Sequence, residues 1–237
     1  MKDSQVTRNQ EPVSSATIVD NDRRRLLALL SVAAGASTLG ASANSAKADS
    51  EPLPMPRRAL TGRDESGKSV FRSFDVTPQV VTFESRPGLV FWEIYATGGT
   101  PGLTGREPDP MLTKDGAVPP ANGSLFRMVL FPPRPPEGTK PNPGAFDAFM
   151  KEAAEKIPGW AENAHYERDN PGMHTTDTLD YVVIIRGELI LELDDGKTVH
   201  LRQGDCVVQN GTRHRWRNPL SEPCLAAAVL IGGRRQG

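Results

Sequence analysis

The side chains whose types suit chemistry gather in one part of the chain, between residues 174 and 214. They are His174, Asp177, Asp180 and His214. Imidazole and carboxylate groups of this kind bind divalent transition metals. The alternative is that both histidines are polar lining of a ligand pocket, with Asp180 hydrogen-bonded to one of them.

Short apolar runs surround these four residues. They cover Tyr181–Ile185, Leu189–Leu193 and Thr198–Leu201. Between them lie Arg186–Gly187 and Asp194–Gly196, which are typical of hairpin turns. Short antiparallel strands at this regular spacing predict a small β-sandwich or β-barrel.

A fixed spacing joins His174, Thr176, Asp180 and Gly187. It resembles the first signature motif of the cupin superfamily, in which a second His stands at the position of Thr176 and a Glu at the position of Asp180. A fold shared by so many chemistries indicates the architecture more strongly than the function. The resemblance implies an all-β, jelly-roll β-barrel.

A second spacing joins Gly204, Gln209, Gly211, His214 and Asn218. It resembles the second cupin motif, with Gln209 where Pro is usual and one residue fewer between Gly204 and His214. Together the two motifs cover about a quarter of the chain directly.

The cupin resemblance implies that His174, Asp180 and His214 meet across the barrel. Two imidazoles and one carboxylate suit one divalent ion of Fe, Mn, Ni, Co or Zn, with open positions for substrate. Relative to the family motif, the site lacks one imidazole at Thr176. Asp177 or Thr176 would then serve as an extra ligand or as a hydrogen-bond partner of one of the ligands.

Alternate residues of a strand face the same side of the sheet. This rule predicts which further residues line the pocket and which lie outside it. Trp216 and Asn218 share a face with His214 and are expected to line the pocket. His200 alternates with apolar neighbours and is expected to face solvent, and His165 lies in a polar stretch that is typical of an exposed loop.

Three further residues have reactive groups in strand contexts. Tyr181 directly follows Asp180, so a regular strand turns it away from the pocket. Cys206 and Cys224 are the only cysteines. In an oxidising compartment they permit one disulfide, and two buried free thiols are the alternative.

The first 48 residues are predicted to be an export signal. Arg23–Arg25 precedes an apolar run, Leu26–Ala43, and two A-x-A sites follow, the second being Ala46–Ala48. The pattern is typical of a cleaved secretory signal and resembles a twin-arginine signal. A membrane anchor is the alternative, but the Gly, Ser and Thr content argues against it. We therefore predict a periplasmic or secreted protein.

Cleavage after Ala48 would leave 189 residues, enough for one domain. It would remove six of the 28 basic and four of the 29 acidic residues, leaving a formal charge of −3. That charge favours neither nucleic acid nor an anionic membrane as a partner, so a small molecule is expected. We divide the mature chain into an extended arm over 49–68 and a barrel over 69–237. Because such arms can lie on a neighbouring subunit, we predict a homodimer.

Other regular elements are predicted from hydrophobic pattern. The expected strands cover Ser69–Phe74, Gln79–Phe83, Leu89–Ala96 and Ser124–Phe131. Phe146–Ile157 has an apolar stripe at helical spacing, so it is expected to be one helix packed on the barrel. Gly98–Pro120 is rich in Gly and Pro and predicts a long loop.

Two function classes remain open. The first is an exported, metal-dependent enzyme acting on a small organic substrate, and the cupin resemblance is compatible with a lyase, decarboxylase, isomerase or dioxygenase. The second is a non-catalytic cupin that binds a small ligand in the same barrel. No Gly-rich phosphate loop is present, which argues against a nucleotide cofactor.

Overall fold

The computed structural model describes residues 55–112, 118–140, 142–157, 159–160 and 164–235. The predicted export signal and the first six residues of the predicted arm lie outside these ranges. Within them, no helix combines the length and apolar character needed to cross a membrane.

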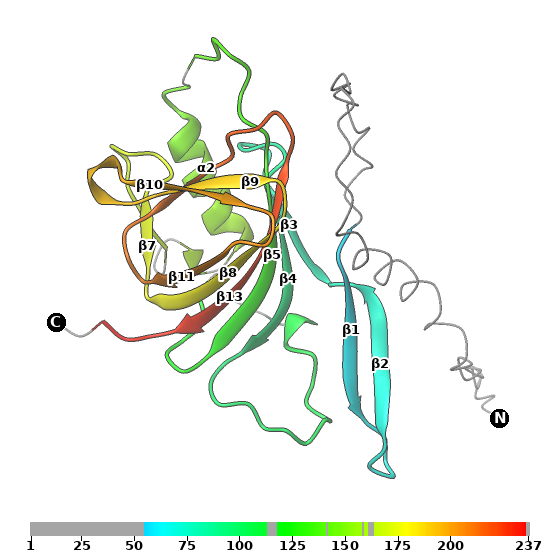
Figure 1. Cartoon of the computed structure of the whole chain (residues 1–237). Coiled ribbons are helices and arrows are strands. Elements are labelled where there is room, and N and C mark those ends of the chain that lie inside the picture. The colour runs from blue at the N-terminus through cyan, green and yellow to red at the C-terminus, as the bar shows by residue number, and fades with distance from the viewer. Residues whose placement is uncertain (1–54, 113–117, 141, 158, 161–163, 236–237) are drawn as a thin grey trace, which may run out of the picture. The chain divides into compact units, whose positions relative to one another are not determined.

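A six-stranded antiparallel sheet forms one wall of the barrel (Figure 1). Its strands, in spatial order, are β11 (Cys206–Asn210), β8 (Thr178–Arg186), β13 (Cys224–Gly232), β5 (Ser124–Phe131), β4 (Val90–Thr97) and β3 (Gln79–Thr82). Smaller sheets complete the barrel. They are β10 (Thr198–Arg202), β9 (Glu188–Glu192) and β12 (Arg215–Arg217), and the pair β6 (Ala164–Tyr166) and β7 (His174–Thr176). The predicted all-β, cupin-type architecture is confirmed.

Strand β8 shows why the sequence folds in this way. Asp180, Val182 and Ile184 are buried, whereas Tyr181 and Ile185 are exposed, so the side chains alternate between the two faces. Tyr181 points away from the interior, as predicted. Gly187 then turns the chain into β9 with φ 86°, a conformation that side chains with a Cβ rarely adopt.

Helix α2 (Ala145–Lys156) is packed on the barrel through its apolar stripe. Phe149 and Ala153 are buried in a cluster with Phe83, Phe91 and Trp160. Aromatic rings dominate this cluster, and Phe83 and Phe149 lie 5.2 Å apart between ring centroids. The predicted packed helix is confirmed. A second apolar cluster, centred on Ile184 and Leu189, fills the other part of the barrel.

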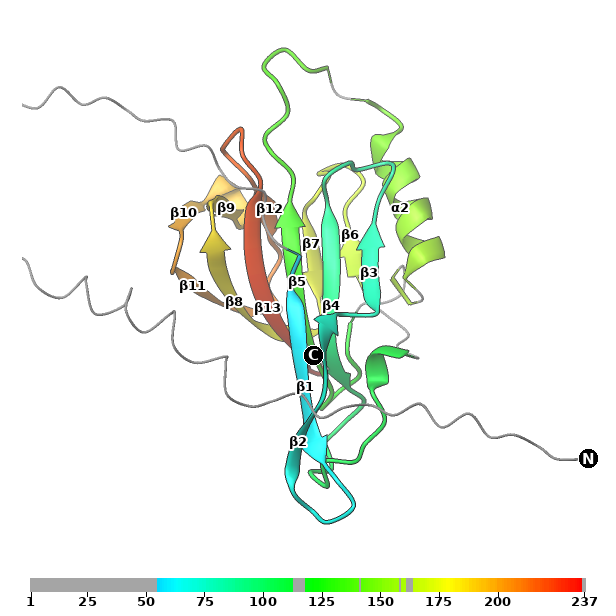
Figure 2. The same cartoon turned by 90° about the vertical axis from the view of Figure 1, so that its right-hand side faces the viewer.

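The predicted arm contains a strand. β1 (Arg57–Arg63) pairs with β2 (Ser69–Val76) in a hairpin that is separate from the six-stranded sheet (Figure 2). The Arg58 guanidinium fixes this hairpin, because Nη1 donates to the Ile94 carbonyl at 3.1 Å and to Asp109 Oδ1 at 2.9 Å. Residues 69–74, which we assigned to the barrel, therefore pair with the arm instead.

Among the described residues, short 3-10 turns interrupt two connections: η2 (Pro110–Leu112) and η3 (Asp194–Gly196). η2 lies in the predicted loop and buries Met111 completely. Cys206 is exposed and Cys224 is buried, and both are free thiols. The disulfide alternative is not observed, and only Cys224 fits the alternative of buried thiols.

Candidate active site

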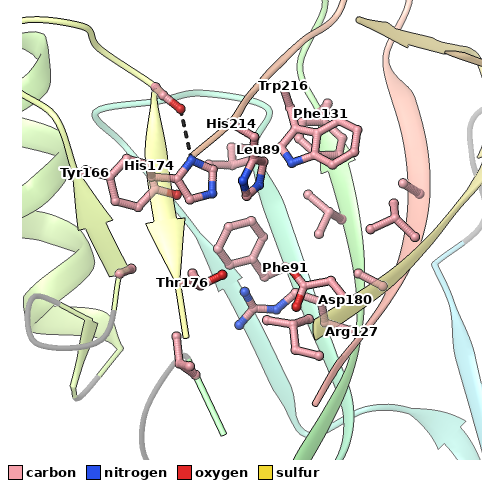
Figure 3. Close-up of a pocket in the computed structure, with 18 of the residues that line it drawn as sticks. Leu89, Phe91, Arg127, Phe131, Tyr166, His174, Thr176, Asp180, His214 and Trp216 are labelled. Carbon is pink, nitrogen blue, oxygen red and sulfur yellow. Dashed lines mark hydrogen bonds between the residues drawn. The ribbon is translucent and has the colours of Figure 1, made fainter. Parts of the chain in front are cut away.

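A pocket lies between the six-stranded sheet, α2 and the β6–β7 pair (Figure 3). Its aromatic lining consists of Phe91, Phe131, Phe149, Trp160, Tyr166 and Trp216. Its polar lining includes Arg127, His174, Thr176, Asp180 and His214. The cavity volume is about 130 Å³. Since one water needs roughly 10–15 Å³ by this measure, the space suits a molecule of about ten non-hydrogen atoms.

The two predicted histidines face each other across an isolated antiparallel bridge. The His174 N–H donates to the His214 carbonyl, and the His214 N–H donates to the His174 carbonyl, both at 2.9 Å. This pairing places the two rings 4.3 Å apart between centroids, at an angle of 48°. Two residues 40 positions apart in the sequence are thus adjacent at one end of the pocket.

Backbone carbonyls select the same tautomer of both imidazoles. His174 Nδ1 lies 3.0 Å from the Gly172 oxygen, and His214 Nδ1 lies 2.9 Å from the Thr212 oxygen. Because a carbonyl oxygen only accepts hydrogen bonds, both contacts favour a proton on Nδ1, whereas the Gln209 amide nitrogen, 3.1 Å from His214 Nδ1, is a donor and opposes it at His214. In the Nδ1-protonated tautomer each Nε2 keeps a free lone pair.

Gln209 explains one departure from the cupin motif. It is buried, and its amide nitrogen donates to the Thr212 carbonyl at 2.9 Å and lies 3.1 Å from His214 Nδ1. A proline at this position would have no amide group to supply. Gln209 therefore helps to hold the loop that fixes the His214 ring.

Burial keeps both histidines neutral. It lowers the pKa of His174 to about 3, helped by the neighbouring His214 and opposed by the hydrogen bond to Gly172. Burial also lowers the pKa of His214, against the hydrogen bond to Thr212. Both imidazoles are therefore bases with an available lone pair at neutral pH.

The low pKa of His174 predicts a loss of stability in acid. In the unfolded chain this imidazole takes up a proton near pH 6.5, whereas in the folded chain it does so only near pH 3. The unfolded state thus binds more protons between these values, so the free energy of unfolding falls as the pH is lowered through this window. We expect His174→Gln to show a shallower fall than the wild type in urea unfolding between pH 7 and pH 4. An identical slope in both proteins would contradict a buried, neutral His174.

Tyr166 is a site residue that the sequence reasoning missed. Its ring stacks on His174 with centroids 4.4 Å apart and an angle of 9°, and Trp160 stacks on its other side at 5.4 Å. Burial raises the pKa of the Tyr166 phenol. We interpreted residues 161–170 as an exposed loop, but Ala164–Tyr166 forms β6, in which Ala164 is buried, His165 exposed and Tyr166 half-buried. No local pattern in the sequence indicates the pairing of this strand with β7.

Asp180 also reaches the pocket, without a full set of partners. It is buried, and its Oδ1 has no hydrogen-bond partner among the described residues. Burial raises the pKa of Asp180, against a hydrogen bond from Thr178 and the positive charge of Arg127. The protein environment of Asp180 therefore favours the protonated carboxyl group more strongly than bulk water would.

A buried ion pair lies beside Asp180 and was not predicted. Arg127 Nε donates to Glu93 Oε2 at 3.1 Å, and a second bond joins the same two groups. The guanidinium also lies 4.7 Å from the Phe91 ring centroid. The sequence contained a signal for this pair: one charged residue stands inside each of the apolar runs SLFRMVLF and LVFWEIYA. Buried charges are almost always paired, so two such residues point to an ion pair.

The site does not fit the predicted three-ligand metal centre. In the parts of the chain that the structure describes, no three His, Cys, Asp or Glu side chains are grouped so that they could hold one ion. Figure 3 shows His174 and His214 at one end of the pocket and Asp180 beside Arg127 at the other. Asp180 is one methylene shorter than the Glu of the family motif, so it reaches less far toward the imidazoles.

The remaining predicted site residues separate into two groups. Trp216 lines the pocket and Thr176 contributes a buried hydroxyl that lies 2.9 Å from Thr178 Oγ1. Asp177, by contrast, is half-exposed and pairs with Arg235 at 2.5 Å, so it assists nothing in the pocket. Asp177 lies in the bend between β7 and β8, where its carboxylate contacts Arg235 instead of the pocket.

Asn218 is also outside the pocket. Its amide donates to the carbonyls of Pro132 and Glu222, and its oxygen accepts from the Leu220 N–H at 2.9 Å. Asn218 therefore organises the loop after β12. His165 is exposed, and His200 lies 2.6 Å from Glu188 at the surface. Both lie away from the pocket, as predicted.

Comparison with known proteins agrees with this architecture. Residues 166–230 match the family described as "Cupin domain". Oryzines biosynthesis cluster protein J of Aspergillus oryzae is 30% identical over 184 residues, covering 76% of this chain and 83% of that protein. Phomopsin biosynthesis cluster protein C' of Diaporthe leptostromiformis is also 30% identical, covering 74% and 77%. The cupin-domain-containing oxidoreductase virC of Hypocrea virens is 28% identical, covering 76% and 77%. The barrel, the two motifs and these relatives together show that this chain belongs to the cupin superfamily.

Proposed function

We propose that the chain is a cupin enzyme that transfers protons within a small organic substrate, as an isomerase or a lyase does. One observation carries this proposal. Two neutral imidazoles with free Nε2 atoms and a carboxyl group with a raised pKa line the same aromatic pocket. A base and an acid held at separate points are the requirement for general acid–base catalysis.

In this proposal each end of the pocket has its own role. Nε2 of His174 or His214 removes a proton from the substrate, because both atoms lack one at neutral pH. The protonated form of Asp180 donates to an oxygen at the other end, where its Oδ1 has no partner among the described residues. Phe91 lies between the two ends in Figure 3 and supports a flat or apolar substrate body. The substrate class is therefore a small carbonyl or hydroxyl compound with a ring or an apolar body.

The relatives support small-molecule chemistry. Two of them carry names that place them in biosynthesis clusters, and the name of a third, from Hypocrea virens, describes it as an oxidoreductase. Oxidation of a similar substrate is therefore a second candidate function. It would require an electron acceptor, and its product would differ from the substrate by two hydrogen atoms.

A deuterium-exchange screen tests the proposal. The purified chain is incubated in D₂O with a panel of small ring-bearing ketones, aldehydes and hydroxy acids, and NMR and mass spectrometry follow the compounds. We expect enzyme-dependent exchange of carbon-bound hydrogen or isomer formation in at least one compound, retained in the presence of a strong chelator. Saturable binding without any chemical change would favour the ligand-binding alternative, and a loss of two mass units would favour oxidation.

Elemental analysis of the same preparation addresses the metal. Near-stoichiometric Fe, Mn, Ni, Co or Zn, together with loss of turnover in the chelator, would favour the metal-dependent enzyme that the sequence predicts. Export, periplasmic or secreted location and a homodimer likewise stay predictions.

A further inference from the structure

Arg86 brings a positive charge to the pocket lining from the loop between β3 and β4. The residue is half-buried, and its guanidinium carbon lies 5.6 Å from the ring centroid of Phe149, which also lines the pocket. No carboxylate among the described residues lies within ion-pair distance of Arg86. A guanidinium held over an aromatic ring keeps its N–H groups available as donors. Arg86 can therefore donate to an anion that enters the pocket.

The other charged groups of the described lining do not neutralise Arg86. The guanidinium of Arg127 is paired with the buried carboxylate of Glu93. Burial raises the pKa of Asp180 and so favours its uncharged form. Both site histidines are neutral, because burial lowers the pKa of each imidazole. The pocket is therefore an aromatic cavity with one uncompensated positive charge.

The charge of Arg86 acts at the histidine end of the pocket. It helps to lower the pKa of His174, after the larger effects of burial and of the second histidine. It also opposes the rise that burial causes in the pKa of Tyr166. At Asp180, by contrast, the positive charge that opposes the effect of burial is that of Arg127. An anion bound by Arg86 would thus lie beside His174, with the rest of the molecule extending toward Asp180.

A buried donor without a partner lies in the same aromatic cluster. Trp160 lines the pocket and is 3% exposed, and its Nε1 has no hydrogen-bond partner among the described residues. Its ring contacts Phe149, with centroids 6.0 Å apart, so Trp160 and Arg86 share this neighbour. Leaving a buried N–H without an acceptor is costly. A bound oxygen anion would supply acceptors for both residues.

We propose that Arg86 binds the carboxylate of the substrate, which is therefore a small carboxylic acid with a flat or apolar body. This inference rests on the proposed function and narrows its substrate class to hydroxy acids and keto acids, whose second oxygen Asp180 receives. The planar guanidinium can donate two parallel hydrogen bonds to a carboxylate. A phosphate monoester carries about 1.5–2 negative charges at pH 7. One uncompensated positive charge suits the single charge of a carboxylate better.

Benzoate and benzamide test the proposal, because they have nearly the same shape and differ in charge. ¹H–¹⁵N correlation NMR titrations of the purified chain measure the two dissociation constants. We expect the wild type to bind benzoate about tenfold or more tightly than benzamide. Arg86→Met is expected to abolish this preference and to leave benzamide binding within about twofold of the wild type. Arg86→Lys keeps the charge without the planar fork, so it is expected to show an intermediate preference.

Arg57→Met is the matched control. Arg57 also lies over an aromatic ring, that of Phe74, but it belongs to the β1–β2 hairpin and does not line the pocket. This variant is expected to keep the full preference for benzoate. Equal affinity of the wild type for both compounds, or a preference that survives in Arg86→Met, would overturn the proposal.

The titration needs no turnover, so its result is independent of the deuterium-exchange screen. A preference for benzoate that depends on Arg86, without exchange in any compound, would support the carboxylate site and count against proton transfer. Exchange in a compound without a carboxylate, together with equal affinity for benzoate and benzamide, would overturn the role of Arg86 and leave proton transfer standing.

Discussion

Replacing Glu93 by Met is expected to lower the free energy of unfolding by about 3–5 kcal/mol, the typical effect of removing one partner from a buried ion pair. Glu93 is 2% exposed and Arg127 8%. The substitution keeps most of the side-chain volume but leaves the guanidinium in a low-dielectric interior without this carboxylate. Urea unfolding followed by circular dichroism measures the change.

Two controls separate charge from packing. The double variant Glu93→Met/Arg127→Met removes both charges and is expected to recover most of the lost stability, because an apolar pair avoids the desolvation cost. Asp147→Ala breaks an ion pair with Arg168 whose side chains are 52% and 70% exposed, and it is expected to cost at most about 1 kcal/mol. If Glu93→Met were as mild as Asp147→Ala, the buried pair would not be the structural element described here.

Replacing His214 by Gln is expected to lower turnover by about 10²–10⁴-fold, the usual contribution of a general base. Glutamine keeps most of the side-chain length, and the bridge between residues 174 and 214 is made by backbone groups, so the loop should keep its conformation. It cannot accept a proton at neutral pH. The assay is the exchange reaction found in the deuterium screen.

The matched controls for this loss are the surface histidines. His165→Gln and His200→Gln are expected to leave turnover within about twofold of the wild type, because neither side chain reaches the pocket. His174→Gln is expected to resemble His214→Gln, and the double variant should lose little more than either single one, since groups that act as a unit are not additive. Full activity in both single variants would contradict the assigned base.

Much of the barrel could be predicted from local sequence patterns, such as strand alternation, turn residues and an apolar helical stripe. The alternation in β8 placed Asp180 inward and Tyr181 outward, and the turn at Gly187 marked the following hairpin. Both features depend on residues that are neighbours in the chain, where the two-residue period of a strand is decisive. The helix α2 followed from its apolar stripe in the same way.

Contacts between distant segments were harder to predict. The spacing of the family motif placed His174 near His214, but the position of Asp180 depends on side-chain length and on the nearby Arg127. Tyr166 enters the site only because β6 pairs with β7, a register that no local pattern indicates. Asp177 carries a suitable carboxylate, yet its partner is Arg235, 58 residues away.

The central claim is that His174 and His214 are neutral bases with free Nε2 atoms in the folded chain. Long-range ¹H–¹⁵N correlation NMR of the imidazoles at pH 7 tests it directly, with the exposed His165 and His200 as internal references. The account predicts a protonated Nδ1 and an unprotonated Nε2 for both site histidines, and no protonation of His174 between pH 8 and pH 5. A proton on Nε2 of either ring, or an imidazolium at pH 7, would contradict it.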